Sequence, residues 1–258
     1  MEFNFSDKTI QITVKDKHSL FRSVEERLRS GVGFALATMN LDHLVKLRGS
    51  AEYRAAYSAH DFISADGNPV VWLSHLSETP IKLVTGSDTM FPLLEIAAQN
   101  NINVGFFGSM PDVLDEASAR LRREIAGLNV VWTKSPEMGF DPTGESARAA
   151  IREMQAAKVQ MCIISLSAPR QEIFSAFGRS MAPEIGFCCF GASLDFVAGR
   201  QVRAPQIVRA LALEWLWRAM SAPRRLVPRY VACAMILPSL AIEAKKLRKS
   251  RQPKHARS

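Results

Sequence analysis

Short, continuously apolar runs alternate along the first 200 residues with longer segments whose apolar residues recur every three or four positions. The runs are typical of strands buried on both faces, and the longer segments are typical of amphipathic helices. The pattern predicts a strand, a turn and a helix in succession within 61–76, 102–127, 159–179 and 184–200, further strands at 8–14, 32–40 and 128–136, helices at 18–31, 86–100 and 143–158, and two helical pieces in 41–60.

This alternation predicts a Rossmann-like α/β fold, with a mainly parallel sheet and helices on both faces. We expect this Rossmann-like core to occupy residues 1–200, followed by a basic helical C-terminal appendage over 201–258. Ligands of such sheets bind beyond the carboxyl ends of the strands. Polar residues gather at those predicted ends, namely Thr38 and Asn40, Asp66, Gly108 and Ser109, Ser167 to Gln171, and Gly191 to Asp195.

Three of these turns have ordinary structural explanations as well as functional ones. The segment VGFFGSMPD around Gly108 lacks the third glycine of a dinucleotide fingerprint, so it indicates either a nucleotide contact or only a tight turn. Asp66 precedes a glycine, which is common turn chemistry, yet a carboxylate at this edge is also placed to act as a general base. In LSAPRQE, Arg170 and Gln171 at a helix start favour an anion, whereas the structural alternative is that Ser167 caps the helix.

Charge is distributed unevenly along the chain. Residues 200–258 carry 14 lysines and arginines against two acids, a net charge of +12, and residues 1–199 carry a net charge of −4. The basic part contains LALEWLWRAM and the apolar run VACAMIL, which we expect to break at Pro238 and to be too short for a membrane span of about 20 residues. Basic, aromatic and apolar residues together favour a segment lying in an anionic membrane interface. The alternative is a helix packed on the core with a disordered basic end.

Other chemistry is only weakly indicated. The five histidines and four cysteines have no metal-ligand spacing, and no Asp-x-Asp, P-loop or GxSxG motif occurs, so we expect no metal site and no cofactor. The cysteines fall mostly in apolar runs and are expected to be buried and unpaired. The N-terminal segment MEFNFSDKTI lacks the pattern of a signal peptide.

Several segments together resemble one family. TMNLDH, SADGNPVVW, VTGSDTM, GFFGSMPDVLDEA, LSAPRQE, FGASLDFVAGRQVRAP and the LEWLWR and PRRL pair occur in the order and spacing of the WecG/TagA/CpsF glycosyltransferases, over about residues 32–228. The resemblance implies a Rossmann-like core with a basic C-terminal appendage. It also implies inverting, metal-independent transfer of a sugar from a UDP-sugar to a polyprenyl-diphosphate-linked acceptor. N-acetylmannosamine, a hexose or a uronate is the implied sugar, in cell-surface or exopolysaccharide synthesis.

The resemblance also implies roles for individual residues. Asp66 matches the family's proposed general base, and Thr38 and Asn40 match the polar pair that lines the same pocket. Gly108 matches the glycine turn near the nucleotide, and Gln171 the glutamine of an APxQE motif. Together with Arg170, Gly191 and Asp195 from the predicted strand ends, the implied substrate-binding set includes the tail arginines Arg218, Arg225 and Arg229, which are expected to close over the diphosphate.

One position departs from the family, which usually has an arginine before VTGSD where this chain has Leu83 beside Lys82. The implied location is cytoplasmic, peripheral on the inner face of the bacterial plasma membrane, with an anionic membrane surface as partner and no nucleic acid. The sequence leaves open whether the protein forms a homo-oligomer. Two other hypotheses remain: a non-catalytic nucleotide- or nucleic-acid-binding module that uses the basic tail, and an NAD-dependent oxidoreductase, which the incomplete glycine fingerprint disfavours.

Overall fold

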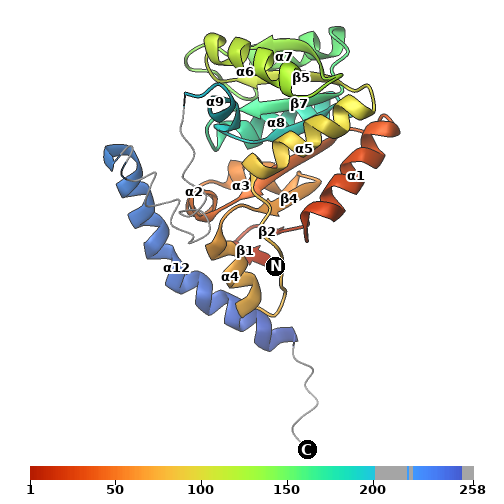
Figure 1. The fold of residues 1–258 in the computed structure, drawn as a ribbon. Helices are drawn as coiled ribbons and strands as arrows, with labels where there is room; N and C mark the ends of the chain where they lie inside the picture. The colour runs from red at the N-terminus through yellow and green to blue at the C-terminus, as the bar shows by residue number, and fades with distance from the viewer. Residues whose placement is uncertain (201–219, 221–222, 252–258) are drawn as a thin grey trace, which may run out of the picture.

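The computed structural model describes residues 1–200, 220 and 223–251, and its core is a six-stranded sheet (Figure 1). All neighbouring strands of this sheet run parallel, in the order β4-β3-β8-β7-β5-β6. The Rossmann-like α/β prediction is therefore confirmed. The strands are β3 (Phe34–Met39), β4 (Phe62–Ala65), β5 (Asn103–Gly108), β6 (Asn129–Lys134), β7 (Met161–Ser165) and β8 (Gly186–Cys189).

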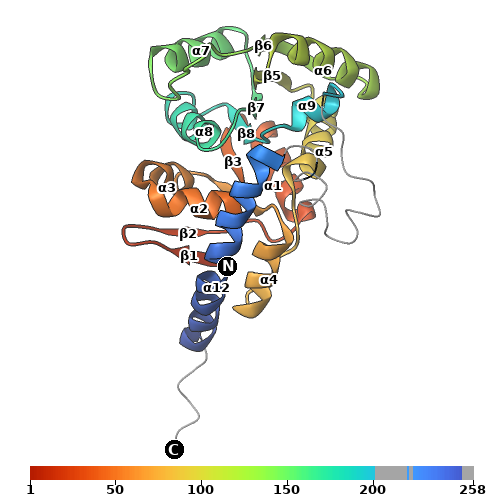
Figure 2. The same ribbon diagram turned by 90° about the vertical axis from the view of Figure 1, so that its left-hand side faces the viewer.

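Helices cover both faces of the sheet, as the two-face burial of the strands predicts (Figure 2). One apolar cluster joins the sheet to α1 (Lys17–Arg29), α5 (Gly86–Gln99), α6 (Pro111–Glu124) and α9 (Ser193–Val197). The other joins it to α2 (Leu41–Gly49), α3 (Ala51–Ser58), α7 (Glu145–Ala156) and α8 (Arg170–Met181). The fold thus leaves the strand ends, rather than the sheet faces, open for a ligand.

A small hairpin lies beside the main sheet, where β1 (Glu2–Asn4) pairs antiparallel with β2 (Thr9–Gln11). The predicted strand at 8–14 is therefore shorter than expected and belongs to a separate sheet. Phe3 and Ile10 from the hairpin are buried in the same cluster as α2 and α3. The chain beyond β2 still follows the main sheet, because the Thr13 and Val14 N–H groups both donate to the Ile63 carbonyl.

The last described element, α12 (Pro223–Arg251), is a long helix that packs along α2 and α4 (Asn68–Leu76). Pro238 interrupts the apolar run, as the sequence indicates, but it does not end the helix. Proline removes one backbone hydrogen bond, but its ring is on the exposed side here, and Leu240 and Ala244 are buried against the core. By length and composition alone, Leu226–Ser250 is apolar enough to cross a membrane, so the apolar stretch is longer than the sequence pattern indicates.

The four cysteines are buried and unpaired, as predicted. At the start of α5 Thr85 is the N-cap, and its hydroxyl accepts a hydrogen bond from the Asp88 N–H at 3.2 Å.

Candidate active site

The parallel sheet brings its carboxyl ends to one edge, and the predicted site residues follow five of those ends. Thr38 and Asn40 lie at the end of β3, and Asp66 directly follows β4. The remaining core residues of the candidate set are Gly108 at the end of β5, Arg170 and Gln171 after β7, and Gly191 and Asp195 after β8. We call Thr38, Asn40, Asp66, Gly108, Gln171, Gly191 and Asp195 the strand-end cluster.

Asp66 and Thr38 are the closest catalytic candidates. The Asp66 N–H donates to the Met39 carbonyl at 2.8 Å, which extends the β3–β4 pairing by one residue and fixes the backbone of Asp66. The Thr38 hydroxyl is then 3.5 Å from Asp66 Oδ2, within donating distance. Thr38 is buried, whereas Asp66 is partly exposed, so the carboxylate remains accessible from outside the sheet.

Asn40 has a structural contact that the sequence did not identify, because its side chain caps α2. Asn40 Oδ1 accepts hydrogen bonds from the Asp42 and His43 N–H groups at 3.0 and 3.3 Å. In return the Asn40 N–H donates to His43 Nδ1 at 3.1 Å, which completes a capping box. The cap holds Asn40 beside Gly67, whose Cβ, if present, would be 3.7 Å from Asn40 Cβ. Asn40 therefore lies next to the Asp66 turn.

Gly108 makes a turn that a larger residue could not make. Its φ is +107°, and a Cβ there would be 2.3 Å from the Ser165 carbonyl oxygen of the neighbouring strand. The turn places Ser109 beside α9, where the Ser109 hydroxyl donates to Asp195 Oδ1 at 3.2 Å. Burial raises the pKa of the half-buried Asp195 carboxyl, while this hydrogen bond acts to lower it.

The start of α8 joins the turns after β7 and β8. Gln171 is buried, and its Oε1 accepts a hydrogen bond from the Gly191 N–H at 3.0 Å. The Ser165 hydroxyl also donates to the Gly191 carbonyl. Arg170 is exposed at the first position of the helix, beside this junction. Pro169 is the N-cap and makes no side-chain capping bond, so the alternative in which Ser167 caps the helix is wrong.

Sequence reasoning missed two structures at this edge. The first turn of α5 closes on the cluster: a Cβ on Gly86 would be 3.5 Å from Thr38 Cγ2 and 3.1 Å from Phe190 Cδ1. The only sequence signal was the VTGSD segment itself. The Ser19 hydrogen bonds lower the pKa of Asp16, and the charge of Lys82, beside Leu83, adds to this effect.

The second missed structure is a pair of buried titratable groups behind the cluster, Glu172 and His43. Glu172 Oε1 accepts a hydrogen bond from Gln171 Nε2 at 2.7 Å and is 3.6 Å from His43 Nε2. Burial raises the pKa of Glu172 to about 7 and lowers the pKa of His43 to about 3. An acid in the first turn of a helix is usually a solvated residue that favours the helix dipole, so the sequence did not identify Glu172 as buried.

One of the predicted tail arginines contacts α2, the helix that Asn40 of the cluster caps. Arg229 Nε is 3.1 Å from Asp42 Oδ1, and Lys46 Nζ is 2.7 Å from Asp42 Oδ2. Lys46 also donates to the Ala168 carbonyl at 3.2 Å, so Asp42 lies between the tail and the turn before α8. Arg218 lies outside the described residues, as does the side chain of Arg225.

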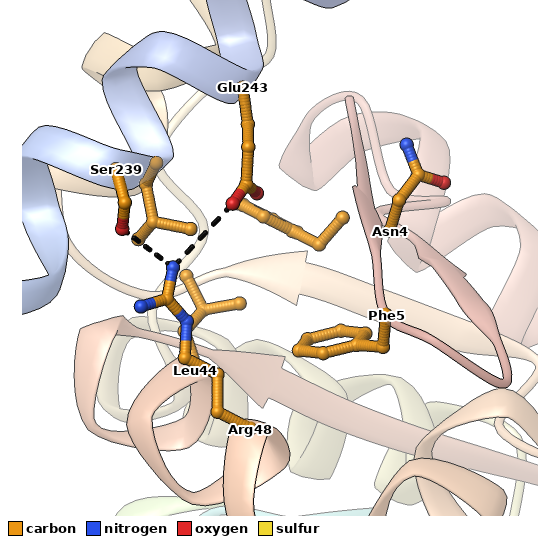
Figure 3. A pocket seen from close by; sticks show the side chains of 8 residues that line it. Asn4, Phe5, Leu44, Arg48, Ser239 and Glu243 are labelled. Atoms are coloured by element: carbon orange, nitrogen blue, oxygen red, sulfur yellow. Dashed lines mark hydrogen bonds and ion pairs between the residues drawn. The ribbon is translucent and has the colours of Figure 1, made fainter.

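Farther along the helix, Figure 3 shows a pocket between β1, α2 and α12. Arg48 crosses it, with Nη2 at 2.7 Å from the Ser239 hydroxyl and 3.6 Å from Glu243 Oε1. The pocket contains no member of the strand-end cluster, so it is part of the junction that holds α12 on the core. Its lining residues are Phe3, Asn4, Phe5, Leu44, Arg48, Ser239, Leu240 and Glu243.

The cluster combines two partly exposed carboxylates, Asp66 and Asp195, with the Thr38 hydroxyl beside Asp66 and several turns at the edge of a parallel sheet. Within residues 1–200, 220 and 223–251, no three His, Cys, Asp or Glu side chains gather in a way that could hold a metal ion. A comparison with family models finds the Glycosyl transferase WecG/TagA/CpsF family over residues 8–252, which is nearly the whole chain.

Proposed function

The chain belongs to the WecG/TagA/CpsF family, a glycosyltransferase family of cell-surface polysaccharide synthesis, and on that premise we propose that it moves a sugar from a UDP-sugar to a polyprenyl-diphosphate-linked acceptor with inversion. The sugar is a HexNAc such as ManNAc, or a hexose or uronate. The observation that carries this proposal is the accessible Asp66 carboxylate beside Thr38 at the carboxyl edge of the sheet. The binding-module and oxidoreductase hypotheses are not carried further, because the family is one of glycosyltransferases.

In the proposed reaction an acceptor hydroxyl attacks the anomeric carbon of the donor. The new C–O bond forms as the bond to UDP breaks, and UDP leaves with the bonding electron pair. Asp66 takes the proton of the acceptor hydroxyl, as a general base. Thr38 supports this role because its hydroxyl donates towards the same carboxylate, and Asn40 supports it because the α2 cap holds its backbone beside the Asp66 turn.

The leaving diphosphate needs positive charge or hydrogen-bond donors. We propose that the turns at Gly108 and Gly191, with Arg170, Gln171 and Asp195, bind the donor, and that arginines from the tail complete the site. The absence of an Asp-x-Asp motif from the sequence supports charge stabilisation by arginines and backbone N–H groups, without a metal. Arg229 supports the role of the tail, because it already contacts Asp42 in the first turn of α2.

We further propose that residues 201–258 are a membrane-association appendage of the 1–200 core. The described helix α12 exposes Val227, Val231, Met235 and Ile242, with Lys245, Lys246 and Lys249 beyond them. Such a surface suits the anionic inner face of a bacterial plasma membrane, on which the enzyme would be peripheral. Because the lipid-linked acceptor lies in that membrane, we expect membrane binding and completion of the site by the tail to be coupled.

The test is the release of UDP from a panel of UDP-sugars, with a detergent-solubilised polyprenyl-diphosphate-sugar acceptor and EDTA present. We expect acceptor-dependent release from one donor, its loss in Asp66→Ala, and a strong decrease when residues 201–258 are removed. No release from any donor, with the tail intact and anionic liposomes present, would contradict the proposed reaction. Full activity of the truncated protein would contradict only the coupling to the tail.

A further inference from the structure

Glu172 is a fully buried acid whose position has no explanation in packing alone. Its side chain is 0% exposed, and its Oε2 has no hydrogen-bond partner. Within the described part of the chain, no lysine or arginine forms an ion pair with it. A buried carboxyl in such surroundings costs stability, whereas an apolar side chain of similar size would not. The contacts of Glu172 therefore have to supply a reason for the carboxyl.

One contact connects Glu172 to the turn after β8. Glu172 Oε1 accepts from Gln171 Nε2, which fixes the orientation of the Gln171 amide, because the nitrogen must face the carboxylate. The amide oxygen then faces the Gly191 N–H and accepts its hydrogen bond at 3.0 Å. If the amide rotated, its NH₂ group would meet the Gly191 N–H, and both donors would lose an acceptor. The carboxylate thus sets the position of Gly191 through Gln171.

A second contact connects Glu172 to the end of β3. Since the Asn40 N–H donates to His43 Nδ1, that nitrogen carries no proton, and the proton of the neutral ring is on Nε2. Nε2 faces Glu172 Oε1 at 3.6 Å. The capping box therefore determines which tautomer His43 adopts, and that tautomer turns its Nε2–H towards the carboxylate in a polar contact longer than a hydrogen bond. Glu172 thus lies between two networks: it accepts a hydrogen bond from Gln171, whose network ends at Gly191, and it faces His43, whose network ends at Asn40.

From this geometry, and resting on the function proposed above, we propose that Glu172 is a positioning residue of the active site. It touches no substrate. Its carboxyl holds the turns after β3, β7 and β8 in one arrangement, through His43 on one side and Gln171 on the other. Loss of the acceptor would let Asn40 and Gly191 move independently, and catalysis would decrease although Asp66 remained.

The surroundings of Glu172 also predict a pH response. Burial raises its pKa to about 7, so its charge changes near neutral pH. The groups that face it do not titrate in that range: burial lowers the pKa of His43 to about 3, and burial raises the pKa values of Tyr53, Tyr57 and Cys189 above their ordinary values. Lys46 on α2 acts on Glu172 by its charge, and Asp42 and Arg229 act on His43. The ionised carboxylate is the stronger acceptor, so we expect turnover to rise with pH through about 7.

The experiment compares Glu172→Leu and Glu172→Gln with wild type and with Asp61→Asn as a matched control. Asp61 is also a partly buried acid with arginine and backbone partners, but it lies at the amino end of β4, away from the site. Two quantities are measured in the full-length folded protein. The first is backbone amide hydrogen exchange at Gly191 and at residues 40–43, and the second is kcat and KM between pH 6 and 8.

For Glu172→Leu we expect amide exchange at Gly191 to accelerate, and kcat to decrease, by about tenfold or more, the effect of one lost charge-assisted hydrogen bond. Glu172→Gln keeps an acceptor, so it should retain turnover near the wild-type value at pH 6 and lose the pH dependence. Asp61→Asn should leave the exchange at Gly191 and kcat unchanged.

The proposal is overturned if Glu172→Leu exchanges at the wild-type rate at Gly191 and 40–43, whatever its activity. If Glu172→Leu does not fold, a wild-type pH profile in Glu172→Gln overturns it instead. Failure of the proposed function has a different signature: wild type shows no acceptor-dependent turnover, while the exchange measurement still decides the role of Glu172. Turnover that is lost in Asp66→Ala but intact in Glu172→Leu would overturn the positioning role alone.

Discussion

Replacing Gly108 by alanine tests the turn that ends β5. Gly108 pairs with Ser165 in the β5–β7 register, and its φ is +107°. A Cβ at this position would lie 2.3 Å from the Ser165 carbonyl oxygen and 2.6 Å from the Ser165 carbonyl carbon. These are backbone atoms of a central strand, which cannot rotate away as a flexible side chain can. Gly108→Ala should therefore separate β5 from β7 at the site.

Two effects set the size of the loss in the free energy of unfolding. A positive φ costs an alanine about 1–2 kcal/mol, of which about 0.4–1 kcal/mol is offset because alanine restricts the unfolded chain. Relief of the overlap with Ser165 costs about 1–3 kcal/mol more, as at other overpacked positions. Together these effects predict a loss of about 1–5 kcal/mol for Gly108→Ala.

Gly31 is the matched control, because it also has a positive φ, +67°, but no atom lies within 4 Å of its ideal Cβ. In Gly31→Ala the free energy of unfolding should therefore decrease only by the cost of the positive φ, about 1 kcal/mol or less. The assay is urea unfolding followed by circular dichroism, in one detergent and at one pH for all three proteins. Equal losses for the two variants would refute the reasoning from the Ser165 overlap.

Three other predictions concern charged groups. The pKa of Glu172 is raised to about 7 from 4.5, so burial of this carboxyl destabilises the wild-type protein increasingly as the pH rises between these values. In urea unfolding, Glu172→Gln should therefore be more stable than wild type at pH 8, by on the order of 3 kcal/mol. This difference should shrink at pH 5. Burial acts to raise the pKa of Asp61, but hydrogen bonds from Ala35 and Arg27 hold this pKa below its ordinary value. Asp61→Asn should therefore be less stable than wild type at pH 7, and the difference should vanish as the pH falls through the lowered pKa. Arg229→Ala should increase proteolytic cleavage within α12. The loss in the free energy of unfolding should stay below about 1 kcal/mol, because the Arg229 side chain is 41% exposed. Unchanged cleavage would mean that the Asp42 contact does not hold the helix on the core.

The sequence was most informative where a local pattern has one dominant cause. Mostly apolar runs predicted every strand of the main sheet, because strands buried on both faces favour apolar residues; the edge strand β6, which is only partly buried, was found from the run NVVW. The polar residues after those runs predicted which edge carries the strand-end cluster. Prediction was less successful where distant residues decide the outcome: β1 is only three residues long and forms because β2 pairs with it.

Contacts between distant segments also explain what the site analysis missed. Pro238 should end a helix on local grounds, yet α12 continues through it because burial of Leu240 against the core stabilises the next turns. Glu172 has the sequence pattern of a solvated acid at a helix start, and it is buried because α3 packs on α8 and His43 of α2 lies beside it. Asn40 was identified as a polar residue at a strand end, but its role as the cap of α2 depends on where that helix begins.

The most direct test of the central claim, that Asp66 is the base of a glycosyl transfer, is acceptor-dependent turnover in Asp66→Asn, with Asp61→Asn as the control. The asparagine keeps the size of the side chain and removes only its ability to take a proton. We predict that kcat decreases by about 10²–10⁴-fold, the usual contribution of a general base, while binding of the UDP-sugar is retained and Asp61→Asn remains active. Turnover of Asp66→Asn at the wild-type rate would contradict the claim.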